Sequence, residues 1–600
     1  MKNKYIILVI FLLSLFSSSC DKDALNLTPL DKYAEEAVWK DPILIQSFVN
    51  NIYLGIPHGF SALMLSSCAD ESMAVWDWES SNVTKSLLTP SYLGIFDEDF
   101  WTSKMRSMNW KAYYKYIRAC NIFLEKIDNI TFEDTMLKDQ LKGEVLFLRA
   151  YYYNQLTSLF GGVPLITKAY VLNDDFFAPR NSYEDCIKFI SDECDKAAAL
   201  LPDAFSGSNK GRASKAAALT LKSRALLYAA SDLANNTAWA TGFSNPELVG
   251  YVGGNRTARW QAAKDAAKAV IDLGKYSLYK ATPAAGENPS TNYGELFLSK
   301  GTSEDIWVKY LLSQYENDWD SGNPGLFNGP NGWHNWGGNT PIQQFVDDFE
   351  MSDGTRFDWN NAAHKAEPYK NRDPRFYATV LYEGAKWRPR PADVKEMDPD
   401  GIIQVGFWEK PGNVVKSGLD TRKSPIEDWN GSSTGYYLRK FMDPTVDHQY
   451  NKQEVPWRFM RYAEVLLNYA EACIALGQEA EASTYINMIR KRAGMPDFPA
   501  SETGQALLNH YRNERRIELA FEEHRFFDIR RWMIAPQVII DAKGIDVRYK
   551  LLPDNTTSAT ATFTVIPLVQ QRAWKNSQYY LPIKLAEMNR NKNLIQNPLY

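Results

Sequence analysis

The sequence predicts a mainly α-helical protein in which a loop-rich, irregular subdomain is inserted between pairs of helices. Apolar residues recur at helical spacing in the first half of the chain and again near its end. The helical segments come in couples, each a longer helix, a turn and a second helix. The stretch 278–457 differs, because it is rich in Gly, Pro, Asn and Trp and holds only short β-like pieces.

The helix couples carry their own start and stop signals. Four amphipathic helices are expected in the first half, at 141–165, 183–202, 212–234 and 259–274. The first stops at Gly161, and Gly274 suits a C-terminal cap of the fourth. A further pair is expected near the end, at 458–478 and 479–494. Two couples hold alanines that let helices approach closely, as in tetratricopeptide-like pairs: Ala216, Ala217, Ala225, Ala463, Ala470 and Ala472. The couples are unevenly spaced, so a regular solenoid is not expected.

These patterns divide the chain into four predicted segments. They are a signal peptide at 1–19, a helical region at 20–277, the loop-rich subdomain at 278–457 and a C-terminal helical region at 458–600. Within the subdomain, 304–312 and 375–382 have β-like composition. Long loops on a rigid scaffold usually carry function. We therefore expect binding residues in the loop-rich subdomain.

The N-terminus has the features of an export signal. Lys2 and Lys4 precede an apolar block, Ile6–Phe16, that is too short to cross a bilayer. Small serines and Cys20 follow, and this arrangement resembles the lipobox of a bacterial lipoprotein, although Ser17 stands where Leu is usual. Cys20 is then the expected lipid anchor and the first residue of the mature chain. The alternative is an ordinary signal peptide with an incidental cysteine.

Charge and cysteine usage exclude several classes of function. The chain has 67 Lys+Arg and 72 Asp+Glu, so no strongly basic face for nucleic acid is expected. Cys186 and Cys194 stand two helical turns apart, too far for a disulfide and without the spacing of a zinc site. We expect the five cysteines after Cys20 to be small buried residues: Cys68, Cys120, Cys186, Cys194 and Cys473.

One charged segment, 513–532, has the composition of a catalytic site. Its paired carboxylates, such as Glu522 and Glu523, are the groups that act as acid and base on a glycosidic bond. However, Glu518/Glu522 and Arg525/Asp528 have the spacings of ion pairs along a helix, and we expect a structural ion-pair network. The six histidines show no ligand spacing, and motifs for metal, nucleotide or acyl-enzyme chemistry are missing from the sequence. No catalytic residue, metal or cofactor is therefore predicted.

Aromatic residues in polar loops are the better functional candidates. Two loop regions, 75–82 and 314–339, place tryptophan and tyrosine among Gly, Asn and Asp. Aromatic rings stack on the flat C–H patches of sugars, and Asn or Asp side chains bond the hydroxyls. The predicted glycan-binding residues are Trp76, Asp77, Trp78, Tyr315, Trp319, Asn331, Trp333 and Trp336. We expect at least two of these rings to meet on one exposed surface. The alternatives are that the rings fill the subdomain's own core, or that the site lies around Trp408 and Trp429.

Several stretches together resemble one known family. They are "GEVLFLRAYYYNQLTSLFGGVPL", "NRDPRFYATVLY", "STGYYLRKF", "RFMRYAEVLLNYAEA", "INMIRKRAG", "ERRIELAFEEHRFFDIRRW" and the terminal "YYLPIKLAEMNRNKNLIQNPLY". In this order the chain resembles SusD/RagB proteins, the glycan-binding outer-membrane lipoproteins of Bacteroidetes. Small departures are Lys584 and Leu599, where the family more often has Pro and Gly.

The resemblance implies four tetratricopeptide-like units packed against an irregular subdomain. It implies capture of poly- or oligosaccharide at the cell surface and a SusC-like TonB-dependent transporter as partner, with this protein as a lid over the barrel. It also implies anchoring in the outer membrane through lipid, and the acidic stretch after Cys20 resembles the surface-export signal of such lipoproteins. The alternatives are a helical glycoside hydrolase and a transporter scaffold that does not touch glycan.

Overall fold

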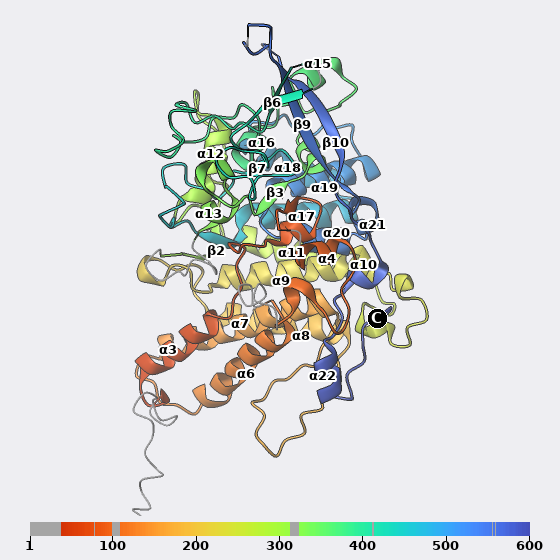
Figure 1. Ribbon diagram of the computed structural model, residues 1–600. Helices are drawn as coiled ribbons and strands as arrows, with labels where there is room; N and C mark the ends of the chain where they lie inside the picture. Colours follow the sequence, from red (N-terminus) through yellow and green to blue (C-terminus); the bar gives the residue numbers. More distant parts are fainter. Residues whose placement is uncertain are drawn as a thin grey trace, which may run out of the picture.

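The computed structural model describes residues 38–76, 79–98, 108–312, 323–410, 413–554, 556–558 and 560–600. The fold is mostly helical with small sheets, as predicted (Figure 1). The long helices of the first half fill the lower part of the view, and the short helices and strands of the loop-rich part lie above them (Figure 1).

Long helices form the scaffold. In the first half they are α3 (Pro42–Tyr53), α6 (Trp110–Ile127), α7 (Thr135–Phe160), α8 (Tyr183–Leu200), α9 (Lys215–Ala230) and α11 (Arg256–Asp272). Near the end they are α17 (Tyr462–Ala475), α18 (Glu479–Arg492) and α19 (Gly504–Glu518). From α6 to α9 each helix packs against the next, α9 packs on α11, and α11 packs directly on α17. The long insertion therefore does not interrupt the row of helices.

Shorter helices connect and cover this scaffold. They are α4 (Glu79–Thr84), α10 (Asp232–Asn235), α12 (Pro289–Leu298), α13 (Pro324–Asn328), α14 (Gln343–Asp347), α15 (Ala362–Ala366), α16 (Pro374–Thr379), α20 (Arg525–Arg531), α21 (Ala535–Val538) and α22 (Leu585–Arg590).

Helix boundaries follow capping residues. The side chain of Ser182 accepts the backbone N–H of Asp185 and starts α8, and Asn255 starts α11 in the same way. Gly161 and Gly274 follow α7 and α11 with positive φ, as expected for helix ends. One boundary was predicted wrongly, because α7 begins at Thr135, where the side chain of Asp134 caps it, rather than at 141.

Ten strands form four small sheets in the described residues. They are β1 (Ser72–Ala74), β2 (Asp305–Lys309), β3 (Asn339–Pro341), β4 (Val380–Leu381), β5 (Phe407–Lys410), β6 (Asn413–Ser417), β7 (Tyr437–Leu438), β8 (Trp457–Arg461), β9 (Ala542–Lys550) and β10 (Thr562–Gln570). The pairs are β1–β3, β2–β8 and β4–β7, and the larger sheet has the order β10-β9-β5-β6. Among the paired strands of the described chain, β5 and β9 run parallel and the other pairs are antiparallel.

Two predicted segments change conformation along their length. The first residues of 458–478 form strand β8, which pairs with β2 before the chain enters α17. The β-like stretch 375–382 is mostly helix α16, because Asp373 caps it and Pro374 occupies its first position; only β4 at its end is a strand. The β-like stretch 304–312 does contain β2.

Two large hydrophobic cores lie in the described part of the chain. The first runs through the long helices, from Ile45 to Leu594, and the second fills the loop-rich part. The second core also takes in Phe60, Phe521 and Val547, which lie outside 278–457. Side chains from the loop-rich part and from the helical parts therefore pack together in this second core.

The five cysteines predicted to be buried are all buried, and none of them forms a disulfide bond within the described residues. Within the described residues, no helix combines the length and the apolar character needed to cross a membrane.

Candidate functional site

The pairing of β1 with β3 brings the two predicted aromatic loops together. Ala74 lies opposite Asn339 in the ladder, and the backbone N–H of Val75 donates to Gly338 O at 3.0 Å. Trp76 follows β1 and Trp336 precedes β3. Because the two strands are antiparallel, both residues lie at the same end of the pair. Their ring centroids are 5.8 Å apart with an interplanar angle of 76°. Both rings are half-buried.

The loop that carries Trp336 is held by its backbone and by a close neighbour. The N–H of Trp336 donates to Leu326 O at 2.8 Å, and its ring lies 5.5 Å from that of Phe327. Gly337 has a φ of +54°, and a Cβ atom there would come within 2.6 Å of Asn430 O. The loop around Asn430 therefore lies directly against the Trp336 loop.

Glu427 joins the polar side chains of these two loops. Its carboxylate accepts hydrogen bonds from the indole of Trp429 and the amide of Asn430. It also lies 4.0 Å from Nδ1 of His334, whose Nε2 is 3.0 Å from Oδ2 of Asp393. His334 has a φ of +57°, which residues other than glycine rarely adopt.

Trp429 is the most exposed ring of this region. Its side chain is 71% exposed. We call the set Trp76, Trp336, Trp429, His334, Asp393 and Glu427 the tryptophan surface. It combines flat aromatic faces with carboxylate and imidazole groups, which is the chemistry that recognises sugar rings and their hydroxyls.

Two predicted binding residues are instead part of the core. Trp333 has no exposed surface, its indole N–H donates to Pro389 O, and the guanidinium of Arg390 lies 3.5 Å from the ring centroid. Asn331 is equally buried and accepts a hydrogen bond from the hydroxyl of Tyr437 at 2.7 Å. Because both side chains are buried, neither is available to a ligand, and both stabilise the loop from within the core.

The other predicted residues lie outside the described residues. They are Asp77, Trp78, Tyr315, Trp319 and the lipid-anchor candidate Cys20.

Trp408, the other alternative, is enclosed between neighbouring strands. The ring of Tyr549 on β9 stacks on it at 5.0 Å and 14°, and Nζ of Lys416 on β6 lies 4.9 Å from it. Because β5 lies between β9 and β6 in the sheet, these neighbours flank Trp408 from opposite sides. Tyr549 thus covers one face of the indole, and Trp408 lies outside the tryptophan surface.

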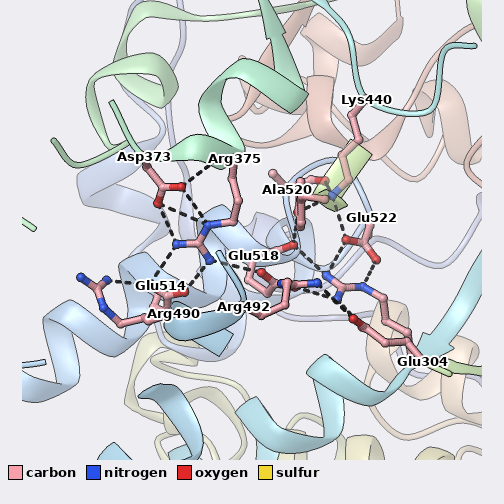
Figure 2. Close-up of polar contacts among 12 residues, drawn as sticks. Glu304, Asp373, Arg375, Lys440, Arg490, Arg492, Glu514, Glu518, Ala520 and Glu522 are labelled. Atoms are coloured by element: carbon pink, nitrogen blue, oxygen red, sulfur yellow. Dashed lines mark hydrogen bonds and ion pairs between the residues drawn. The ribbon is translucent and has the colours of Figure 1, made fainter. Parts of the chain in front are cut away.

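Four of the five carboxylates in the segment 513–532 form ion pairs, and several of these are drawn in Figure 2. The fifth, Glu523, is half-buried and accepts the backbone N–H of Leu65 at 3.4 Å. Nη1 of Arg461 lies 2.7 Å from Glu518, and Nε of the same arginine lies 2.7 Å from Glu522. Lys440 donates to Glu522 at 2.8 Å. Further members of this buried network are Glu304, Asp373, Arg375, Arg490, Arg492 and Glu514.

The charges around Glu518 decide its protonation. Burial alone would raise the pKa of Glu518, but Arg492 and Arg461 beside it hold that pKa well below its ordinary value. The pKa of Glu522 is lowered in the same way by Arg461 and Lys440. Burial, with four arginines nearby, keeps the pKa of His524 well below its ordinary value. This arrangement has the electrostatics of a structural network in which Glu518 and Glu522 stay ionised.

An ion-pair network was predicted, but its partners were predicted wrongly. Helix α19 ends at Glu518, so Glu518 and Glu522 do not share a helix face. Arg525 pairs with Asp70 rather than with Asp528. Asp528 pairs with Arg515 and Arg531. Most of the partners come from distant parts of the chain and tie the elements together. Among the described residues, no group of three or more His, Cys, Asp or Glu side chains could hold a metal ion.

Two family models match the chain. The model of the SusD family matches residues 303–600, and a model described as starch-binding associating with outer membrane matches residues 30–227. Among curated relatives, SusD-like protein P25 of Formosa agariphila is 23% identical over 460 residues, which are 75% of this chain and 73% of that protein.

Solved structures of similar proteins share the fold. A SusD-like protein from Bacteroides fragilis is 28% identical with a TM-score of 0.74, and the match covers 96% of this chain and 100% of that one. A SusD-like carbohydrate-binding protein from the same organism is 24% identical with a TM-score of 0.69, covering 93% of this chain and 100% of that one. At that identity the second likeness shows the fold alone.

Proposed function

Because the chain belongs to the SusD family, we propose that it binds poly- or oligosaccharide on the tryptophan surface and delivers it to a SusC-like TonB-dependent transporter. The observation that supports binding is the exposed ring of Trp429, linked through Glu427 to His334 beside the Trp76–Trp336 pair. A sugar that stacks on an indole face can place its hydroxyls against these carboxylate and imidazole groups.

The place of action in this proposal is the outer membrane, facing outward, with the lipid on Cys20 as anchor. Support comes from the family model described as associating with outer membrane and from the lipobox-like sequence before Cys20. The transporter partner is supported by family membership. A lipid-anchored binding protein keeps captured glycan close to the barrel, which raises its local concentration.

The proposal includes no hydrolysis. Glu518 and Glu522 are buried, and each carboxylate is held by two or more cations inside the protein, so neither is free to act on a glycosidic bond. A general acid in a glycosidase needs a raised pKa, and the pKa values of these two groups are lowered. The protein then acts by binding alone.

The proposal is tested by glycan titration of single alanine variants. In a screen of plant, host and microbial polysaccharides, one class should bind the wild type. Trp429→Ala should weaken that binding by about 2 kcal/mol, on the order of thirtyfold, because a stacking anchor is removed. Trp336→Ala should weaken it in the same direction. Isothermal titration calorimetry measures both effects.

Trp408→Ala is the matched control, since it removes a half-buried indole that stacks on Tyr549 and lies outside the tryptophan surface. It should leave glycan affinity unchanged. Equal affinity of all three variants and wild type would contradict the proposed site. New reducing ends on incubation with the glycan, lost in Glu522→Gln, would contradict the absence of hydrolysis.

Anchoring is tested by substitution of the expected lipid-bearing residue. Cys20→Ala should move the protein from the membrane to the soluble fraction, because no thiol remains for the diacylglycerol. Fractionation and labelling with a radioactive fatty acid measure this. A variant that stays in the membrane and still takes up label would show that the anchor lies elsewhere.

A further inference from the structure

We propose that a second, arginine-lined cleft binds the carboxylate of an acidic saccharide that contains uronate residues. The cleft has a volume of about 430 Å³ and lies between the loop after α14 and helices α19 and α21. Four arginines line it: Arg356, Arg512, Arg516 and Arg525. It shares no residue with the tryptophan surface.

Two of these arginines are neutralised by the protein. Arg525 forms a bidentate pair with Asp70, with both contacts at 2.8 Å. Arg516 contacts Asp348 and, at 3.2 Å, Asp70. Its Nε nevertheless has no hydrogen-bond acceptor, although the residue is only 8% exposed. A buried donor without an acceptor is costly and points to a missing partner.

The other two arginines have still fewer ion-pair and hydrogen-bond partners in the protein. Arg512 reaches a carboxylate only at 3.5 Å, on Asp232, and its Nε is buried without an acceptor. Arg356 is exposed at the rim and forms no ion pair within the described part of the chain. Guanidinium groups of this kind bind carboxylate and sulfate oxygens through paired N–H donors.

The acidic side chains in the cleft are already in use. Asp347 accepts hydrogen bonds from Gln343 at 2.7 Å and Trp359 at 3.0 Å. Glu350 pairs with Arg490 at 3.0 Å and His510 at 2.6 Å. None of these contacts involves Arg512 or Arg356, so these two cations are not neutralised by Asp347 or Glu350 and can meet an incoming anion.

The remaining walls suit the body of a sugar rather than a bare ion. Ile534 and Val538 offer half-buried apolar surface, and Asn509 and Gln537 are exposed amides at the same cleft. Such a wall contacts C–H groups, and the amides bond hydroxyls. The saccharide part of this assignment rests on the proposed function; the anion part rests on the arginines alone.

The test is calorimetric titration of the full mature chain with three probes: trigalacturonate, inorganic sulfate and maltotriose. Trigalacturonate should bind, and Arg512→Gln and Arg356→Gln should each weaken it about tenfold, because each removes a charge-assisted contact. Arg356 is exposed, so its variant should fold normally even if Arg512→Gln lowers stability. The matched control is Arg118→Gln, an exposed arginine on α6, which should bind as wild type does.

Each outcome decides a part of the proposal. Trigalacturonate that does not bind, or that binds equally to Arg356→Gln, Arg512→Gln and Arg118→Gln, overturns it. Sulfate binding without trigalacturonate binding overturns the saccharide assignment. Trp429→Ala should leave trigalacturonate affinity unchanged, so a failure of the tryptophan surface and a failure of this cleft are distinguishable. A loss of trigalacturonate binding in Trp429→Ala would place the acidic sugar on the tryptophan surface and contradict the second site.

Discussion

Replacing Glu518 by glutamine is expected to cost about 3–5 kcal/mol of unfolding free energy. Glu518 is fully buried and its carboxylate lies against Arg461, Arg492 and Arg375 (Figure 2). Glutamine keeps the shape of the side chain but removes its charge, so three buried guanidinium groups lose part of their neutralisation. Chemical denaturation at pH 7 measures the loss.

The pH dependence of that loss has a definite sign. The folded-state pKa of Glu518 is lowered, so its charge stabilises the fold above the unfolded pKa of roughly 4.3. That stabilisation disappears as pH falls below this value, and wild type and variant should converge in acid. Glu295→Gln is the control, because Glu295 pairs with Lys280 at the surface and should cost below about 1 kcal/mol. A Glu518→Gln variant as stable as Glu295→Gln would show that the network does not hold the fold together.

Trp333→Ala is expected to cost a similar amount, about 3–5 kcal/mol, without a selective effect on glycan binding. The substitution leaves a cavity in the second core and removes the ring that covers the guanidinium of Arg390. Arg390 also pairs with Asp398 at 2.7 Å and Asp420 at 2.8 Å. Loss of the ring therefore admits water to a buried ion cluster.

Trp429→Ala is the matched comparison, because the same side chain is removed from a 71% exposed position. Its melting temperature should stay close to that of wild type. If Trp333→Ala keeps wild-type stability while glycan affinity falls, Trp333 contacts the glycan. Its ring would then be exposed in the conformation that binds glycan.

The helical scaffold could be predicted because its signals are local. The spacing of apolar residues placed α8 and α11 to within a few residues, and Gly161 and Gly274 marked helix ends. Strand β8 could not be separated from α17 in the same way. It exists because β2 pairs with it across about 150 residues of chain, which local periodicity does not record.

The candidate site could be predicted only in part, because contacts between residues distant in sequence decide which rings are buried. The composition of 75–82 and 314–339 indicated aromatic binding loops, and β1–β3 pairing does place Trp76 beside Trp336. Burial of Trp333 depends on Arg390 and Pro389, which no local pattern links to it. Trp429 was named only as an alternative, because it stands alone in its loop and joins the site through Glu427.

The ion pairs of the charged segment 513–532 could likewise be predicted only in part. Its composition indicated a network, and the i,i+3 contact of Arg531 with Asp528 is present. The contacts of Glu518, however, come from Arg461, Arg492 and Arg375, up to 143 residues away. Long-range ion pairs are set by how elements pack, so residue spacing within one helix does not reveal them.

The central claim, that glycan binds on the tryptophan surface, is tested most directly by one titration. The tightest-binding glycan from the screen is titrated by calorimetry into wild type and into a triple variant with Trp76→Ala, Trp336→Ala and Trp429→Ala. We predict that binding to the triple variant falls below detection while its melting temperature stays near that of wild type. Unchanged affinity in a folded triple variant would contradict the claim and place the glycan elsewhere on the protein.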